Sequence, residues 1–251
     1  MSIVQKFYDT MASHYDKLFA DWQATTHEQA MILDKLFRSS GFDTHARVLD
    51  CACGIGTQAI GVAALGYRVT GSDLSAGELE EAKLRAAQNG VSIDFAQANF
   101  CVLENVFCEQ FDIVMAMDNA LPHMLTRADL ESAIGSIVGR VRDGGLFVAS
   151  IRDYDEMLKL KPSYSPPYIH QTDKGQRVSF QTWHWNEESY KLVQYIIEDE
   201  DTLQIGKFEC EYRATRREEM TELLLAKGCT EVQWLFPEDT GFYQPIVMAR
   251  K

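Results

Sequence analysis

The segment RVLDCACGIGTQAIGVAA, residues 47–64, decides the fold of this chain. It begins as a short apolar strand that ends in Asp50, and it continues as a helix after a short loop. In the loop, small residues stand at alternate positions, at Ala52, Gly54 and Gly56. Small residues let the backbone turn tightly against a ligand and leave the amides at the helix start free to face it. A tight turn without a ligand is the simpler interpretation, but the elements that follow favour a binding site.

Apolar strands and helical stretches alternate along most of the chain. Such alternation predicts a mostly parallel sheet with helices on both faces, joined by right-handed crossovers. The expected strands are residues 47–50, 67–72, 92–97, 111–117, 146–151, 230–236 and 244–250, and the expected helices are residues 57–65, 76–89, 127–141 and 215–228. The predicted fold class is therefore α/β, with a seven-stranded, mostly parallel sheet.

Two regions, residues 1–45 and 153–213, do not follow this alternation. In residues 1–45 apolar side chains recur at helical intervals, which predicts an N-terminal helical cap. In residues 153–213, after a stretch rich in Pro, Tyr and Lys, polar residues alternate with aromatic and β-branched ones, which predicts an antiparallel meander. Because this insert cannot extend a parallel sheet, we expect it to form a β lid across the strands' carboxyl ends, after the fifth strand. Residues 46–152 and 214–251 then form the main domain.

Composition and charge restrict the classes of partner. The 251 residues include 24 Lys and Arg against 37 Asp and Glu, a net charge of −13, so a nucleic-acid backbone would be repelled. No apolar run approaches the roughly 20 residues that span a bilayer, and the polar start is unlike a signal peptide. The cysteines form no C-x-x-C pair, and no His/Cys spacing is typical of zinc. We expect a cytoplasmic protein with no nucleic-acid, membrane or metal partner. The segment 236–248 could pack against another subunit, giving a homo-oligomer, or equally close the domain's own core.

Asp73 follows the second expected strand, seventeen residues after Gly56. An acid at this place accepts hydrogen bonds from ribose hydroxyls, and it can also cap the helix that begins near Ser75. Taken alone, these features would also suit a nicotinamide dinucleotide and an oxidoreductase. The spacing D-x-A-x-G-x-G favours another ligand, because Asp50 before the loop would repel a pyrophosphate but attract a sulfonium and an ammonium.

These motifs resemble class I S-adenosylmethionine-dependent methyltransferases, and they are most similar to the glycine N-methyltransferase and glycine/sarcosine N-methyltransferase branch. The resemblance rests on VLDCACGIGT (48–57), GSDLS (71–75), the pair Asn99-Phe100, MDNALPHM (117–124) and VRDGGLFVASIRDYDE (141–156). It covers about residues 46–155. It implies a Rossmann-like fold, S-adenosylmethionine as the cofactor, S-adenosylhomocysteine as the product and a small-molecule methyl acceptor.

The resemblance also assigns a cofactor pocket. Within it, Asp73 would hold the ribose, Asn99 and Phe100 would read the edge and face of the adenine, and Met117 and His123 would close the methionine end. The residues that it assigns to the cofactor are Trp22, Ala52, Gly54, Gly56, Asp73, Leu74, Asn99, Phe100, Met117 and His123.

The resemblance assigns a second group of residues to the acceptor. Asn119 and Arg152 would hold a carboxylate, with Tyr154 beside them, and guanidinium is the natural bidentate partner of a carboxylate. Tyr15 is the best counterpart of a tyrosine near the transferred methyl, with Tyr8 as the other candidate. An amine must attack unprotonated, so Tyr15, His123 or water would take its proton. The simpler interpretations are that Asn119 and His123 shape a turn and that Arg152 is a solvated charge.

The predicted function is methyl transfer to a small molecule, with the amine of a glycine-like or sarcosine-like metabolite as the acceptor. One alternative is O-methylation of a larger metabolite under a roomier lid. Another is a protein that binds S-adenosylmethionine without catalysis. For the lid aromatics Trp183, Trp185, Tyr190 and Tyr195, packing in a half-buried sheet is favoured over an amine cage.

Overall fold

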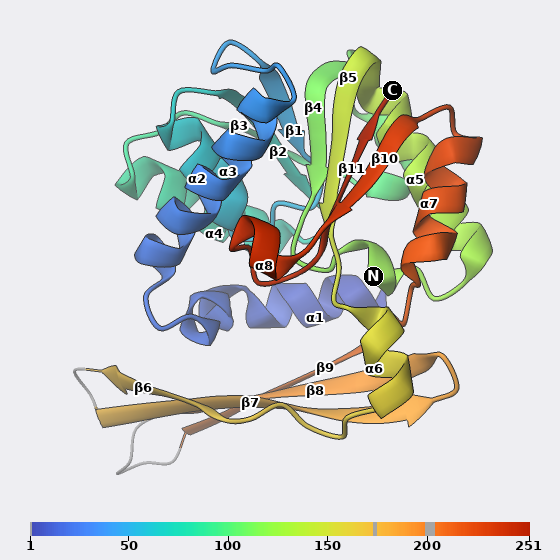
Figure 1. Ribbon diagram of the computed structural model, residues 1–251. Helices are drawn as coiled ribbons and strands as arrows, with labels where there is room; N and C mark the ends of the chain where they lie inside the picture. The colour runs from blue at the N-terminus through green and yellow to red at the C-terminus, as the bar shows by residue number, and fades with distance from the viewer. Residues whose placement is uncertain (1, 173–174, 199–203) are drawn as a thin grey trace.

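The computed structural model describes residues 2–172, 175–198 and 204–251, which form a main domain and a second, separate sheet (Figure 1). The strands of the main sheet are β1 (Arg47–Asp50), β2 (Arg68–Asp73), β3 (Asp94–Gln97), β4 (Phe111–Ala116), β5 (Val141–Ser150), β10 (Thr230–Leu235) and β11 (Ile246–Arg250). The strands of the second sheet are β6 (Tyr168–Thr172), β7 (Gly175–Asn186), β8 (Ser189–Glu198) and β9 (Gln204–Arg213). We call this second sheet the lid.

The main sheet has the strand order β10-β11-β5-β4-β1-β2-β3. Strands β1 to β5 are parallel, whereas β11 is antiparallel to both of its neighbours. The chain moves outward from β1 to β3 and then returns to β4 on the other side of β1, so a topological switch point lies between β1 and β4. Ligands of such sheets bind beyond the carboxyl ends of the strands at this point. The predicted seven-stranded, mostly parallel sheet is confirmed.

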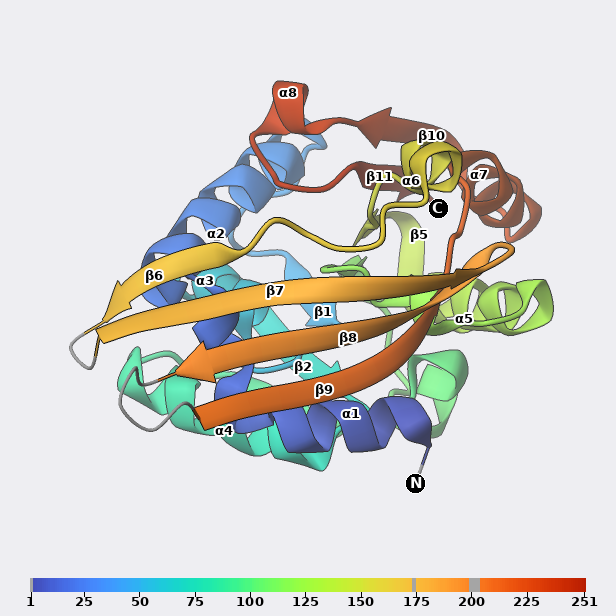
Figure 2. The ribbon, with the colours of Figure 1, turned by 90° about the horizontal axis from the view of Figure 1, so that it is seen from below.

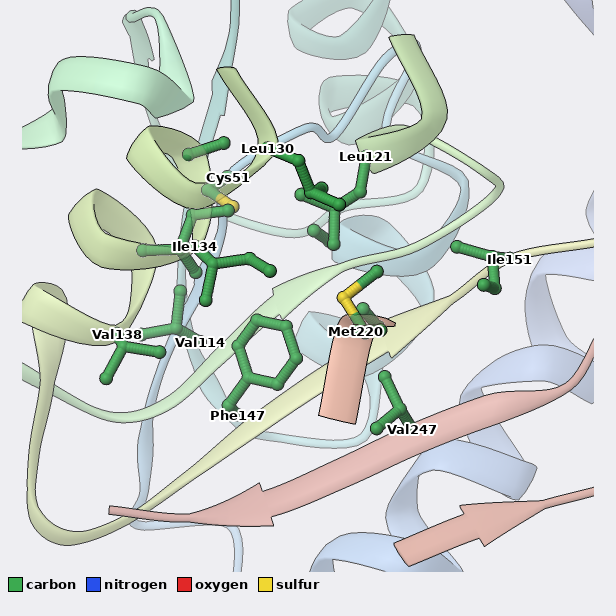
Figure 3. Packing of buried hydrophobic residues seen from close by; sticks show 14 of the residues in the cluster. Cys51, Val114, Leu121, Leu130, Ile134, Val138, Phe147, Ile151, Met220 and Val247 are labelled. Atoms are coloured by element: carbon green, nitrogen blue, oxygen red, sulfur yellow. The ribbon is translucent and has the colours of Figure 1, made fainter. Parts of the chain in front are cut away.

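Helices cover both faces of the main sheet. The helices in the described part of the chain are α1 (Ile3–Met11), η1 (Ala12–Leu18), α2 (Trp22–Ser39), α3 (Thr57–Ala64), α4 (Ala76–Gln88), η2 (Phe100–Asn105), η3 (Leu121–His123), α5 (Arg127–Arg140), α6 (Tyr154–Leu160), α7 (Arg217–Ala226) and α8 (Pro237–Thr240), and α1 lies at the carboxyl edge of the sheet, next to the lid (Figure 1). Val48 and Val148 pack on the side of α2 and α3, whereas Val114 and Phe147 pack with Ile134 on the side of α5 (Figure 3). Because both faces of the sheet are buried at its centre, the central strands β4 and β5 contain continuous apolar runs.

The lid lies below the carboxyl ends of the main strands, and Figure 2 shows its four strands from below. Each lid strand is antiparallel to its neighbour, so the predicted meander after the fifth strand is confirmed. Helix α1 lies beside β9 in both views. The sequence analysis did not anticipate α6 or β6, which occupy the stretch rich in Pro, Tyr and Lys. Within the predicted helical cap of residues 1–45, α1 ends at Met11 and the chain continues as the tighter η1.

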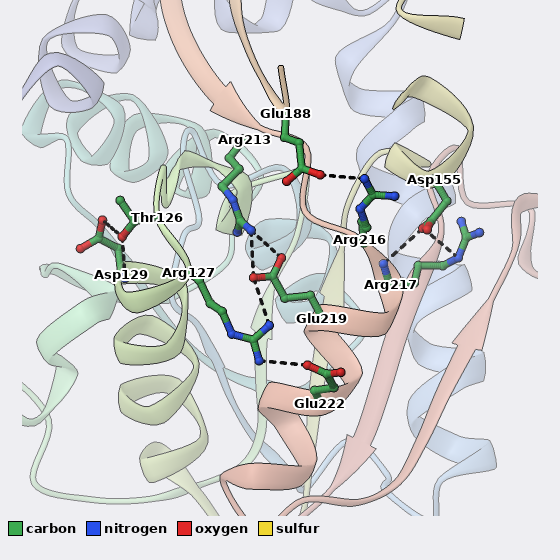
Figure 4. A network of polar contacts seen from close by, with 10 residues as sticks. All are labelled: Thr126, Arg127, Asp129, Asp155, Glu188, Arg213, Arg216, Arg217, Glu219 and Glu222. Atoms are coloured by element: carbon green, nitrogen blue, oxygen red, sulfur yellow. Dashed lines mark hydrogen bonds and ion pairs between the residues drawn. The ribbon is translucent and has the colours of Figure 1, made fainter. Parts of the chain in front are cut away.

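Ion pairs attach one end of the lid to α7 (Figure 4). Arg213, at the end of β9, donates to both oxygens of Glu219 at 2.9 and 2.8 Å, and both side chains are largely buried. Arg216 pairs with Glu188 of the β7–β8 turn at 2.7 Å. Arg217 Nε lies 3.3 Å from Asp155, at the start of α6. This end of the lid is therefore held to the main domain by several charged contacts.

The segment 236–248 closes the chain's own core, since Phe242, Ile246 and Met248 are buried there. Across the described ranges, no helix is both long and apolar enough to cross a membrane. Within the same ranges, no group of three or more His, Cys, Asp or Glu side chains is arranged to hold a metal ion.

Candidate functional site

The loop between β1 and α3 lies against Asp73 at the end of β2. Gly54 and Gly56 have φ of 52° and 90°, the left-handed region that favours glycine. The Gly54 amide donates to Asp73 Oδ2 at 2.9 Å, and the Ser75 amide donates to Asp73 Oδ1 at 2.9 Å. The structure thus brings the glycine loop and the acid together. Asp73 already holds two backbone amides, and each of its oxygens keeps a lone pair for a further donor.

Two buried carboxyl groups border this loop. Asp50 is fully buried, and its Oδ2 has no hydrogen-bond partner among the residues that the structure describes. Burial raises the pKa of Asp50 to about 8. Glu78 of α4 is also fully buried, neither of its oxygens has a described partner, and burial raises its pKa well above the usual range. A Cβ added to Gly54 would lie 3.3 Å from Glu78 Oε2. The site therefore holds acceptor atoms that lack a donor.

The other residues assigned to the cofactor surround this loop. The Trp22 indole donates to Thr57 Oγ1 at 3.0 Å, at the start of α3. Asn99 is exposed beyond β3, where its Oδ1 accepts from the Cys101 amide at 2.9 Å, and Phe100 beside it is half-buried. Leu74 is half-buried next to Asp73, whereas Ala52 is half-buried in the loop. Met117 is buried in the core that includes α2 and α3.

His123 is paired with Tyr8 of the N-terminal helix. The Tyr8 hydroxyl and His123 Nε2 are hydrogen-bonded at 2.8 Å, and Cys210 Sγ lies 3.5 Å from His123 Nδ1. The ring of Tyr212 lies over His123 with 4.2 Å between the ring centres. Burial lowers the pKa of His123 to about 4, so the ring is neutral at pH 7. Both ring nitrogens are thus engaged.

A cavity of about 850 Å³ lies between the lid, the N-terminal segment and the carboxyl edge of the main sheet. Its walls include Tyr15 from η1, Asp118 and Asn119 after β4, Arg152 after β5 and Trp183 from β7. Tyr8 also lines it, whereas His123 and the glycine loop do not. Tyr15, Asn119 and Arg152, which were assigned to acceptor binding or catalysis and are far apart in sequence, thus line the same cavity.

Arg152, Asn119 and Tyr154 form one hydrogen-bonded group. Asn119 Oδ1 accepts from the Arg152 amide at 3.1 Å and from the Tyr154 hydroxyl at 3.0 Å. The Tyr154 hydroxyl also lies 3.0 Å from that of Tyr190. Asn119 is 3% exposed, and its Nδ2 has no partner in the described part of the chain. A buried donor is therefore free beside the cavity.

The Arg152 guanidinium is held by neutral groups of the lid. It donates to Gln181 Oε1 at 2.9 Å and to the Tyr190 hydroxyl at 3.4 Å. Its central carbon lies 5.3 Å from the centre of the Trp183 ring. It forms no ion pair with any residue of ranges 2–172, 175–198 or 204–251. Trp183 and Tyr190 were expected only to pack in the lid, but they also contact this cation.

Sequence analysis missed Asp118, which directly precedes Asn119 in the MDNALPHM turn. Its Oδ2 accepts from Gln58 at 2.8 Å, and its Oδ1 accepts from Tyr243 at 2.7 Å. These partners come from α3 and from the segment before β11. The one feature of the sequence that could have pointed to Asp118 is an acidic residue at the end of an apolar strand. Nothing in the sequence indicates that Gln58 and Tyr243 are its partners.

Residues 48–145 match the family described as a methyltransferase domain. The fold resembles that of a solved S-adenosylmethionine-dependent methyltransferase from Clostridium acetobutylicum, with a TM-score of 0.75 at 16% identity over 97% of this chain and 98% of that chain. The chain is 24% identical over 155 residues to the glycine/sarcosine N-methyltransferase of Parasynechococcus marenigrum, covering 62% of the chain and 54% of that protein. It is 38% identical over 106 residues to the ubiquinone biosynthesis O-methyltransferase of Chelativorans sp., covering 42% of the chain and 40% of that protein. The chain thus spans about half the length of these relatives, which include both N- and O-methyltransferases.

The fold also matches a solved structure over nearly its full length. The S-adenosylmethionine-bound structure of CalS10, an amino pentose methyltransferase from Micromonospora echinaspora, superposes with a TM-score of 0.76. The match covers 90% of this chain and 91% of that chain at 17% identity. This structural match covers more of the chain than the methyltransferase-domain match over residues 48–145, and it establishes the fold.

Proposed function

We propose that this protein transfers a methyl group from S-adenosylmethionine to the amine of a small metabolite that carries a carboxylate. The observation that carries the proposal is the Arg152 guanidinium, which faces the cavity and forms no ion pair with any described residue. Asn119 Nδ2 is a second free donor beside the same cavity. A cation without an ion pair and an unpartnered amide donor together match a carboxylate.

The residues around the glycine loop fit S-adenosylmethionine. The unpartnered oxygens of Asp50 and Glu78 require donors or a positive charge, and the methionine part of the cofactor carries an ammonium and a sulfonium. Asp73 would hold the ribose hydroxyls, and Leu74, Asn99 and Phe100 would surround the adenine. When bound, S-adenosylmethionine supplies a methyl group on a positively charged sulfur.

The protein's main contribution would be to position the acceptor. Arg152 and Asn119 would fix the carboxylate, and Tyr15, which lines the cavity, would orient the reacting nitrogen. Holding two reactants in the reactive geometry can supply on the order of 7–11 kcal/mol. Burial raises the pKa of Tyr15 well above its usual range, and the charge of Asp118 raises it further. Tyr15 therefore keeps its proton at pH 7, and its role would be to hydrogen-bond.

His123 would act through Tyr8. Its Nε2 is bonded to the Tyr8 hydroxyl, and Tyr8 lines the cavity whereas His123 does not, so a proton from the acceptor would reach His123 only by way of Tyr8. A pKa of about 4 makes the His123 ring a weak proton acceptor. We therefore propose that His123 mainly holds Tyr8 in place.

The size of the cavity favours a second candidate, a larger acceptor. Cavities of about 300–1,000 Å³ hold drug-sized ligands, and a volume of about 850 Å³ exceeds what glycine needs. A larger hydroxylated acceptor, methylated on oxygen, would fit this space. A protein that only binds the cofactor would have no use for the free donors of Arg152 and Asn119.

A screen with methyl-labelled S-adenosylmethionine tests these candidates. The panel contains amino carboxylates, their hydroxy counterparts and amino sugars, and S-adenosylhomocysteine is measured. We expect acceptor-dependent product with an amino carboxylate. Product formation only with hydroxy compounds would favour the second candidate, and cofactor binding without any product would favour the binding protein.

Replacing Arg152 tests its role in binding the acceptor carboxylate. Arg152→Ala should raise the KM for the acceptor at least tenfold and change the Kd for S-adenosylmethionine less than threefold, because the guanidinium faces the acceptor cavity. The control is Lys207→Ala, which removes an exposed positive charge from the lid. Equal effects of Arg152→Ala on the acceptor and the cofactor would contradict the proposal.

A further inference from the structure

We infer that Asp118 binds the reacting amine of the acceptor, so that the cavity recognises a molecule with an amine at one end and an anionic group at the other. This inference rests on the proposed function and deepens it. Asp118 and Arg152 both line the cavity, and they carry opposite charges.

The backbone around Asp118 holds its side chain in place. Asp118 and Asn119 have φ of 54° and 67°, two consecutive left-handed residues at the end of β4. Such backbone persists where the surrounding structure supports it, and it clusters at functional sites. The Asp118 amide donates to Ser150 Oγ at 2.8 Å, and the Asn119 amide donates to the Ser150 carbonyl at 3.0 Å. The end of β5 therefore supports this turn.

The Asp118 carboxylate is hydrogen-bonded but not neutralised. It accepts from Gln58 Nε2 and from the Tyr243 hydroxyl, and Gln58 is itself held by Gln29 at 2.7 Å. These neutral donors occupy one lone pair on each oxygen, so both oxygens retain acceptor capacity. Asp118 forms no ion pair with the residues described in the structure. A negative charge at the cavity wall thus lacks a cation.

Asp118 lies between the acceptor cavity and the cofactor residues. Its negative charge contributes to the raised pKa of Tyr15, after burial, and to that of Asp50 near the glycine loop. Glu28 and Glu238 also line the cavity, but both are exposed, and water solvates their charges. Asp153 lines it as well and is paired with Arg217. Among these carboxylates, Asp118 is therefore the one that is both sheltered and unpaired.

This position suits the proton balance of amine methylation. An acceptor ammonium would give one proton to the Asp118 carboxylate, which becomes neutral, and the nitrogen regains its lone pair. That lone pair forms the N–C bond as the S–C bond breaks. The positive charge passes from sulfur to nitrogen, and S-adenosylhomocysteine leaves as a neutral thioether.

Binding of matched probes tests the inference. The probes are the ω-amino carboxylates glycine, β-alanine, 4-aminobutyrate and 6-aminohexanoate, each compared with its ω-hydroxy counterpart. Binding to the full chain is measured by calorimetry in the presence of S-adenosylhomocysteine. We expect at least one amino compound to bind the unchanged protein at least tenfold more tightly than its hydroxy counterpart. Asp118→Asn should reduce this preference to below threefold and leave the Kd for S-adenosylhomocysteine within threefold.

Asp153→Asn is the matched control, because it alters another carboxylate of the same cavity that is already paired. It should keep the amine preference. Equal binding of amino and hydroxy compounds to the unchanged protein, no binding of any amino compound, or a preference that survives Asp118→Asn would each overturn the inference. If the unsubstituted protein does not bind S-adenosylhomocysteine at all, that result would instead overturn the proposed function.

Discussion

At the scale of single residues, Asp50 is one of two buried carboxyl groups in the proposed cofactor site, and its Oδ2 has no partner among the described residues. It is fully buried, and among the described residues its side chain accepts one hydrogen bond, a long one of 3.4 Å from the Ala52 amide to Oδ1. Because burial raises its pKa to about 8, most of the Asp50 carboxyl is protonated at pH 7. A cation placed beside it would favour the charged form and lower that pKa. Cofactor binding should therefore release a proton.

Calorimetry in two buffers checks this prediction. At pH 7, binding of S-adenosylmethionine should release close to one proton, so the observed enthalpy should depend on the ionisation enthalpy of the buffer. Asp50→Asn removes the Asp50 proton and should clearly reduce this dependence, whereas any remaining proton release would come from Glu78, whose pKa burial also raises. The same enthalpy in phosphate and Tris for the unchanged protein would contradict the proposed role of Asp50.

Which residues the sequence could predict depends on how local their chemistry is. Asp73 and Gly54 were predictable as neighbours because the ends of β1 and β2 meet at one edge of a parallel sheet. Asp118 was not, because its partners Gln58 and Tyr243 come from elements far apart in the sequence. The engagement of both His123 nitrogens likewise depends on how α1 and β9 pack.

At the scale of elements, the contact between α2 and α3 leaves no space for a side chain at Gly61. A Cβ there would lie 2.5 Å from the Thr26 carbonyl oxygen and 2.8 Å from Ala30 Cβ. The close contact places Trp22 beside Thr57 at the start of α3. Gly139 of α5 offers the opposite case, since a Cβ there would have no atom within 4 Å.

Substitution of these two glycines should have opposite effects. Gly61→Ala should lower the free energy of unfolding by about 1–3 kcal/mol, because the added methyl group forces the helices apart. Gly139→Ala should raise it by about 0.5 kcal/mol, because alanine is the better helix former. Urea denaturation measures both. A shift of both midpoints in the same direction would contradict this packing argument.

The predictability of elements follows from their apolar patterns. Strands β1 and β4 are short, mostly apolar and largely buried, and the sequence located them to within a residue or two. The helix α6 and the strand β6 lack such a signal. Tyr168 and Ile169 of β6 are exposed, so the strand carries no alternation of buried and polar residues. Pairing with β7 forms it instead.

At the scale of the whole molecule, the N-terminal segment and the lid enclose the cavity together. Lys17 of η1 pairs with Glu198 of β8 at 2.6 Å, and Arg177 of β7 donates to the Phe19 carbonyl at 2.7 Å. Both contacts lie far in sequence from the glycine loop. An exposed or half-exposed ion pair contributes about 0–1 kcal/mol to stability, so its effect should be on local opening.

Lys17→Met tests this connection. It should change the free energy of unfolding by less than about 1 kcal/mol, yet it should speed amide hydrogen exchange in residues 3–18 several-fold. Lys207→Met is the control, because it breaks an exposed ion pair with Glu209 within the lid. Unchanged exchange in residues 3–18 of Lys17→Met would show that this ion pair does not hold the segment.

The residues proposed to bind the cofactor and those proposed to bind the acceptor occupy different parts of the chain. Apart from the N-terminal segment, the groups proposed for the cofactor precede residue 118, and those proposed for the acceptor come from residue 118 onward. The lid is also anchored at one end to α7, outside the part that matches the methyltransferase domain. On the proposed assignment, insertions and substitutions in this later half would change the acceptor, while the residues that bind the methyl donor would stay the same.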